Sequence, residues 1–94
     1  MARGDQGVFA ISVAARMASM EIQNLRVYER RGLVDPDRTA GGTRLYSEAD
    51  VDRLLRIGEL LSDGLNLAGI ARVLEMEHLV ERLLAENARL RARD

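Results

Sequence analysis

The sequence predicts a mostly α-helical fold, in which a module of short elements precedes one long C-terminal helix. Three features lead to this prediction. Two short helical patterns are separated by a break at residues 19–21. Two β-prone runs then enclose a loop rich in Pro, Asp and Gly. Finally, the 29 residues from 66 to 94 contain no Pro and a single Gly, so a helix can run through them uninterrupted.

The N-terminal part is expected to lead from a flexible arm into the first helix. Residues 1–7 are polar and rich in Gly, and residues 8–11 are suited to a short extended segment. Ser12 is a good N-cap and is predicted to open a helix of about two turns. The predicted buried side of this helix consists of Val13, Ala14 and Met17.

A second helix is predicted from about Ile22 to Arg31, with Gly32 as the residue that ends it. Ile22, Leu25 and Glu29 share one face at the spacing i, i+3 and i+7, which we expect to pack inward. Two short helices joined by a tight turn form a helix-turn-helix.

The opposite side of the second helix carries polar side chains of an informative kind. It presents Gln23, Asn24, Arg26, Val27, Arg30 and Arg31. Gln, Asn and Arg are the side chains that pair with adenine and guanine edges in the major groove. The side therefore suggests nucleic-acid recognition, and an ordinary solvated face remains the alternative.

The next segment has the pattern of a β-hairpin. Residues 33–34 and 44–46 are expected to form strands around the loop at 35–43, in which Gly41 and Gly42 supply positive φ angles. A hairpin directly after a helix-turn-helix is a wing.

Charge is distributed unevenly. All 14 cations are Arg, and residues 1–46 hold seven Arg against five acidic residues, whereas residues 47–94 hold seven against ten. The wing contributes Arg38 and Arg44 together with the hydroxyl of Tyr46. Arg suits bidentate contacts with phosphate and guanine, so these residues suggest nucleic-acid binding. A genome that favours Arg codons is the alternative explanation for the absence of Lys. A simple turn with solvated charges is the alternative explanation for the wing.

A third helix is expected to follow at once. Residues 47–50 (Ser-Glu-Ala-Asp) form a capping box before an apolar run, and Gly64 ends the helix after about Asp63. Its apolar side is predicted to hold Val51, Leu54, Leu55, Gly58 and either Leu60 or Leu61.

The last helix is expected to need a partner. Asn66 caps it, and its first turns, with Leu67, Ile70, Val73 and Leu74, are predicted to complete the core. Heptads then place Val73, Val80 and Asn87 at position a and Met76, Leu83 and Leu90 at position d. At 1.5 Å per residue the helix would be about 44 Å long, more than a small globule can cover. A second copy of the chain is the expected partner, and such a dimer suggests double-stranded DNA.

Composition excludes several classes of function. The absence of Cys excludes disulfides, thiolate metal sites and Cys nucleophiles. There is neither an apolar stretch of about 20 residues nor a signal-peptide pattern, so a cytoplasmic location is expected. With no Lys and with His78 as the single His, we expect no metal, no cofactor and no enzymatic site.

Two segments carry a resemblance to a known family. Residues 25–34 (LRVYERRGLV) and 41–51 (GGTRLYSEADV) resemble the signature of the MerR family of bacterial transcription regulators, and the similarity extends over residues 8–77. Residues 8–15, 39–42 and 66–70 resemble its heat-shock repressor (HspR-like) branch. Ser19 and Glu21 stand where family members usually have Gly and Ser.

After the flexible arm expected at 1–7, the resemblance implies a winged helix-turn-helix DNA-binding domain at 8–75 and a coiled-coil dimerisation helix at 76–94. It implies an antiparallel coil and a nucleoid-associated homodimer that represses transcription from an inverted-repeat operator, with stress-response genes as targets. RNA polymerase or an Hsp70 chaperone would be further partners. Glu29 is expected to orient a wing Arg. The expected DNA contacts are Ser12, Arg16, Gln23, Asn24, Arg26, Val27, Tyr28, Arg30, Arg38, Arg44 and Tyr46.

Three other functions remain open at this stage. An activator would deform promoter DNA instead of blocking it. A small architectural or recombination-directionality protein would bind cooperatively along repeats, without a two-fold dimer. A coiled-coil adapter would use its helix to capture another protein.

Overall fold

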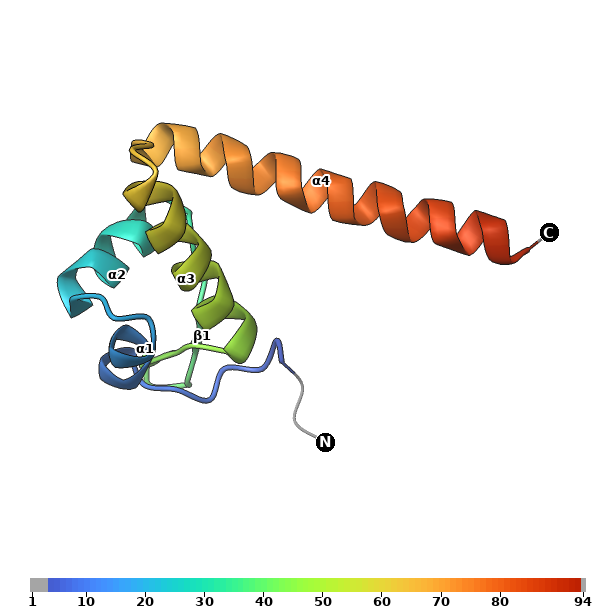
Figure 1. Cartoon of the computed structure of the whole chain (residues 1–94). Helices are drawn as coiled ribbons and strands as arrows, with labels where there is room; N and C mark the ends of the chain where they lie inside the picture. Colours follow the sequence, from blue (N-terminus) through green and yellow to red (C-terminus); the bar gives the residue numbers. More distant parts are fainter. Residues whose placement is uncertain (1–3, 94) are drawn as a thin grey trace. The chain divides into compact units, whose positions relative to one another are not determined.

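The computed structural model describes residues 4–93, so residues 1–3 of the predicted arm lie outside the described part. The chain divides into two compact units, Met1–Leu60 and Leu61–Asp94. The elements, labelled in Figure 1, are α1 (Ile11–Met17), α2 (Ile22–Arg30), β1 (Asp37–Arg38), β2 (Arg44–Leu45), α3 (Glu48–Ser62) and α4 (Leu67–Ala92). The mostly helical fold with a small two-stranded wing and a long C-terminal helix is confirmed.

Helix α1 begins at Ile11, two residues earlier than a Ser12 cap requires, so that prediction is wrong. Ala10 is the N-cap, with an extended backbone and no side-chain cap bond. The reason is a non-local pairing: Phe9 and Tyr46 form an antiparallel bridge, in which the Phe9 N–H donates to the Tyr46 carbonyl (2.9 Å) and the Tyr46 N–H donates to the Phe9 carbonyl (2.7 Å). The bridge holds the lead-in extended as far as Ala10.

The buried side of α1 also differs from the prediction. Val13 and Met17 are 39% and 45% exposed, whereas Ala14, Ala15 and Ala18 are buried. Small alanine side chains let α1 pack closely on α2. The break between the two helices is as predicted, and Ser19 occupies it with a positive φ of 56°.

Helix α2 ends as its sequence predicts. Gly32 has a φ of +76°, its N–H donates to the Glu29 carbonyl (3.0 Å), and the Leu33 N–H donates to the Tyr28 carbonyl (2.9 Å). These two bonds make a Schellman motif.

The wing, which we define as β1, β2 and the loop between them, is shorter than predicted. The strands are antiparallel, with Asp37 opposite Leu45 and Arg38 opposite Arg44. The expected strand at residues 33–34 is wrong: Leu33 and Val34 are buried in the core, and pairing starts only after Pro36. Proline lacks the N–H that a ladder needs.

The wing loop (residues 39–43) turns tightly, because the Thr39 N–H donates to the Thr43 carbonyl (2.9 Å) and leaves three residues in the turn. The Gly42 N–H donates to the Thr39 carbonyl (2.9 Å), and Gly42 has a φ of +85°. A type I turn followed by a left-handed glycine is a common form of three-residue hairpin loop. Positive φ was expected at both Gly41 and Gly42, and Gly42 alone of the two adopts it.

Helix α3 carries the predicted capping box. The Ser47 N–H donates to the Asp50 carboxylate, the Asp50 N–H donates to the Ser47 hydroxyl, and both distances are 2.9 Å. The buried residues of α3 are Val51, Leu54, Ile57 and Leu60. Leu55, expected on this side, is 43% exposed, because the buried positions recur every three residues from Val51.

In the second unit, α4 is one unbroken helix (Figure 1). The Asn66 side chain accepts a hydrogen bond from the Gly69 N–H (2.8 Å), as an N-cap should. Ile70 and Leu74 are buried and Val73 is partly buried. Among the described residues, no helix is both long and apolar enough to cross a membrane.

Candidate nucleic-acid interface

Helix α2 presents its polar side to solvent. Leu25 is fully buried and Tyr28 is 6% exposed, and these two residues fix the inward side of the helix. The exposed residues are Gln23, Asn24, Arg26, Arg30 and Arg31, and Val27 is partly exposed. The predicted outward side is therefore available to a partner, as HTH recognition by the second helix requires.

Glu29 joins α2 to the wing. One carboxylate oxygen accepts from Arg38 Nη2 (2.5 Å) and the other accepts from Arg44 Nε. Arg38 also donates from Nη1 to the Gly42 carbonyl (3.1 Å). One side chain of α2 thus holds a cation from each wing strand, which confirms the expected pairing of Glu29 with a wing Arg.

The protonation state of Glu29 follows from these contacts. Partial burial raises the pKa of Glu29, but the hydrogen bonds and positive charges of Arg44 and Arg38 outweigh it and leave the pKa below its ordinary value. The hydrogen bond to Glu29 raises the pKa of Arg44 in turn. Glu29 and Arg44 are therefore both charged at neutral pH.

Arg44 keeps donors free for another partner. It uses Nε for Glu29, and within residues 4–93 its two terminal amino groups make no other hydrogen bond. Its side chain is about one third exposed (32%). An Arg held at Nε with its terminal amino groups directed elsewhere is suited to bind a phosphate.

Two predicted contact residues lie in the core. Tyr46 is fully buried, and its hydroxyl has no hydrogen-bond partner within the described residues. Burial raises the pKa values of both Tyr28 and Tyr46, so the two phenols stay protonated. The backbone bridge to Phe9 accompanies the burial of Tyr46 inside the module. No bound partner tests the predicted DNA contacts of Tyr46 and Tyr28, so both stay predictions.

The other predicted contacts remain predictions. Ser12 and Arg16 are exposed on α1, and Arg38 is exposed on the wing. No bound partner tests them.

Sequence reasoning missed two side chains that hold the wing and the segment before it. Asp37 of β1 accepts a hydrogen bond from the Gly7 N–H (2.9 Å), and Arg53 of α3 donates from Nε to the Leu33 carbonyl. The Ala49 N–H also donates to the Gly4 carbonyl (2.8 Å). Gly4 and Gly7 of the predicted flexible arm are therefore hydrogen-bonded to the module. No local pattern marks these contacts, since each joins residues far apart in the chain.

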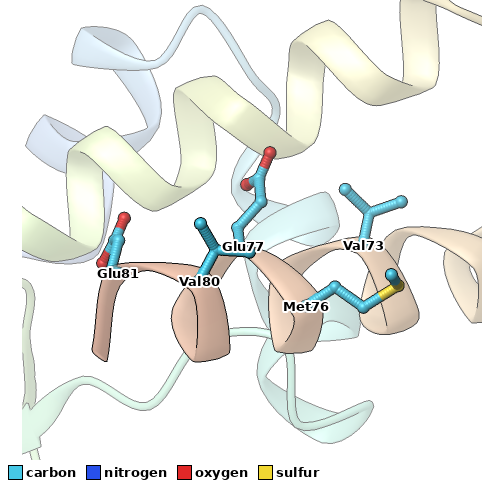
Figure 2. Close-up of a pocket in the computed structure, with 5 residues that line it drawn as sticks. All are labelled: Val73, Met76, Glu77, Val80 and Glu81. Atoms are coloured by element: carbon cyan, nitrogen blue, oxygen red, sulfur yellow. The ribbon is translucent and has the colours of Figure 1, made fainter. Parts of the chain in front are cut away.

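A second surface of interest lies on α4. Six large apolar side chains are 47–66% exposed there: Met76, Leu79, Val80, Leu83, Leu84 and Leu90. We call these residues the α4 stripe. Figure 2 shows Met76 and Val80 of the stripe beside Val73, Glu77 and Glu81, the five residues that line a hollow along the helix. An exposed apolar stripe of this size is typical of a partner surface.

The chain matches the family model described as MerR HTH family regulatory protein over residues 9–77. It is 48% identical over 89 residues to the heat shock protein HspR of Streptomyces coelicolor, covering 94% of this chain and 59% of that protein. It is 44% identical over 70 residues to the HTH-type transcriptional regulator GlnR of Bacillus anthracis, covering 74% of this chain and 54% of the regulator. The chain thus spans somewhat more than half the length of these relatives.

A solved structure extends the similarity to three dimensions. It is the structure of HiNmlR, a MerR family regulator lacking the sensor domain, bound to promoter DNA. The TM-score is 0.69 at 28% identity, with 84% of this chain and 65% of that chain covered.

Proposed function

This chain belongs to the MerR family of HTH regulatory proteins, and we propose that it is a DNA-binding transcriptional regulator acting as a homodimeric repressor at an inverted-repeat operator. In this proposal α2 enters the major groove and the wing contacts the adjacent backbone. The similarity to HspR supports heat-shock or other stress genes as targets.

The observation that carries the proposal is the joint presentation of α2 and the wing. The exposed side of α2 holds groups that pair with base edges, and Glu29 fixes two wing cations to the same helix. Gln23, Asn24 and Arg26 are the proposed base contacts; Arg16, Arg30, Arg38 and Arg44 are proposed to bind phosphates and to supply most of the affinity. Ser12 is a further proposed contact.

Dimerisation is proposed to occur through α4. The proposed contact residues are Val73, Met76, Val80, Leu83, Asn87 and Leu90, and the α4 stripe supports them, because a second copy would cover its exposed apolar area. Two modules carried by one dimer would bind half-sites about 34–36 Å apart, or a multiple of that distance, along the duplex.

Selection of binding sites from a random duplex pool tests the proposal, because it reports sequence, symmetry and spacing together. We expect enrichment of an inverted repeat. Recovery of direct repeats with cooperative binding would favour an architectural protein instead. A complete lack of enrichment would remove the regulatory proposal.

The finer partners require their own measurements. RNA polymerase is proposed as a further partner at the promoter, and footprinting with polymerase present tests whether the two proteins bind there together. An Hsp70 chaperone is proposed to bind as a co-regulator, and a shift of the operator complex upon its addition tests this. Cytoplasmic, nucleoid-associated localisation is proposed from the same DNA-binding role.

A further inference from the structure

One apolar side chain stands on the otherwise polar outer side of α2. Successive residues of a helix turn by about 100°, so Gln23, Val27 and Arg30 share one sector of the helix surface, away from the buried Leu25. Gln23 and Arg30 are exposed, and Val27 is partly exposed between them. Ile22 is also partly exposed, but it lies towards the inner side. Val27 is therefore at the centre of the surface that would face DNA.

The chemistry of the major groove limits what Val27 can contact. Base edges there present hydrogen-bond donors and acceptors, with one apolar exception, the 5-methyl group of thymine. Valine has no hydrogen-bonding group in its side chain. A polar edge opposite it would lose its water without gaining a partner, which is unfavourable.

The shape of valine makes the contact specific in position. A β-branched side chain has one strongly preferred rotamer in a helix, so its methyl groups are fixed relative to the α2 backbone. It is also short, so it touches only a group that lies close to the helix axis. Gln23, one turn earlier, and Arg30, nearly one turn later, hold polar groups on either side of it.

We propose that Val27 is a specificity-determining residue that contacts the 5-methyl group of a thymine in each half-site. The proposal rests on the proposed function, since it presumes that α2 enters the major groove. The proposal names the chemical group of the operator that the middle of α2 recognises.

Replacement of thymine by deoxyuridine tests this contact, because it removes the methyl group and leaves all hydrogen-bonding groups in place. Each thymine of the selected half-site is replaced in turn, and binding is measured for the full-length chain. At one position the substitution should weaken wild-type binding about fourfold, the value of one buried methyl group. The Val27→Ala variant should bind both duplexes equally at that position.

Two further variants complete the design. Val13→Ala removes an exposed valine from α1 and should leave the thymine-to-uracil ratio at the wild-type value. Val27→Thr retains one methyl group at the same branch point and should keep part of the ratio. Because each ratio compares two duplexes on one protein, a loss of stability in a variant does not change it.

The outcomes separate this inference from the function beneath it. Specific binding without any methyl-sensitive thymine overturns the role of Val27 and leaves the regulator intact. If Val27→Ala keeps the fourfold thymine-to-uracil binding ratio, another residue contacts the methyl group. That result also overturns the role of Val27 and leaves the regulator intact. Failure to bind any duplex overturns both.

Discussion

At the scale of single residues, Ser19 is the one non-glycine residue with a positive φ within residues 4–93. Its φ of 56° lies in the left-handed region, which costs an L-residue about 1–2 kcal/mol. The position is in the turn between α1 and α2, where a glycine would adopt this φ without strain. Ser19 therefore makes the turn of the helix-turn-helix less stable than a glycine would.

Ser19→Gly should therefore stabilise the protein by about 0.5–1 kcal/mol, the relieved strain minus the entropy that glycine loses on folding. Urea unfolding at fixed protein concentration measures this change. Ser12→Gly is the matched control, because Ser12 lies inside α1 and glycine should destabilise it by about 0.5 kcal/mol. Equal effects of the two substitutions would contradict the role of the turn.

Arg44 is the wing cation best placed to bind a phosphate. Arg44→Ala should weaken binding to specific and non-specific duplexes alike and reduce the slope of log K against log salt by about one unit. Titrations at several salt concentrations measure both quantities. A loss of discrimination between sites, with unchanged non-specific binding, would show that Arg44 contacts a base instead.

Replacing Glu29 removes an anion from the surface where Arg44→Ala removes a cation. Removing an anion near DNA should strengthen binding if charge alone mattered, yet Glu29→Gln should weaken it about tenfold, because the charged hydrogen bonds that hold two wing cations are lost. The salt slope should stay near the wild-type value, since the phosphate-binding cations remain. Glu29→Asp should restore part of the affinity, and tighter binding by Glu29→Gln would refute the positioning role.

The lowered pKa of Glu29 adds a pH dependence with a defined sign. Because the folded pKa lies below the unfolded value, the stabilising contribution of Glu29 is present above its ordinary pKa of 4.5 and is lost as pH falls through the folded pKa. The free energy of unfolding of Glu29→Gln should therefore fall less than that of the wild type below pH 4.5. Parallel pH profiles of the two proteins would contradict the ion-pair geometry.

At the scale of elements, the wing depends on the segment that precedes α1. Gly7 donates its N–H to Asp37, and a Cβ at Gly7 would collide with the Leu45 carbonyl oxygen and lie 2.9 Å from the Asp37 Cβ. Val8 and Phe9 both donate to the Tyr46 carbonyl (3.0 and 2.9 Å). The lead-in thus behaves as an additional partner strand for a two-residue hairpin, which would be marginal alone.

Gly7→Ala should displace this segment and destabilise the first unit by about 1–3 kcal/mol, as overpacking against backbone atoms does. Faster hydrogen exchange of the Phe9 and Tyr46 amides would locate the effect. Gly4→Ala is the control, because a Cβ there meets no atom within 4 Å. Equal tolerance of alanine at both glycines would contradict the close approach.

The same contacts explain which elements the sequence predicts. The ends of α2, α3 and α4 are encoded locally, by Gly32, by the Ser47–Asp50 box and by Asn66, and the structure confirms each. The start of α1 and the position of β1 depend on the bridge between Phe9 and Tyr46 and on Pro36. Such non-local constraints leave no periodic signal, so the local pattern wrongly favours a Ser12 cap and a strand at residues 33–34.

At the scale of the whole molecule, the sequence predicts the part of the candidate site that local periodicity determines. The exposed side of α2 follows from helical periodicity, and all its predicted polar residues lie outward. The burial of Tyr46 and the contacts of Asp37 and Arg53 emerge only when distant segments pack together. The heptads in turn indicated a partner for α4, and the exposed α4 stripe is the area that such a partner would cover.

Leu83→Glu tests whether dimerisation through this stripe underlies operator binding. Leu83 is 59% exposed, at a predicted d position, and a second copy would bury it. An unpaired carboxylate in that interface should raise the dimer dissociation constant about a hundredfold. Sedimentation should then show a monomer, and binding to the paired operator should fall to the level of a single half-site, with the first unit still folded by circular dichroism. Ala85→Glu adds the same charge at an outward heptad position of α4 and should leave both measurements unchanged. If Leu83→Glu remains dimeric, the subunits associate through another surface. That surface would then have to hold the two DNA-binding modules at the two half-sites.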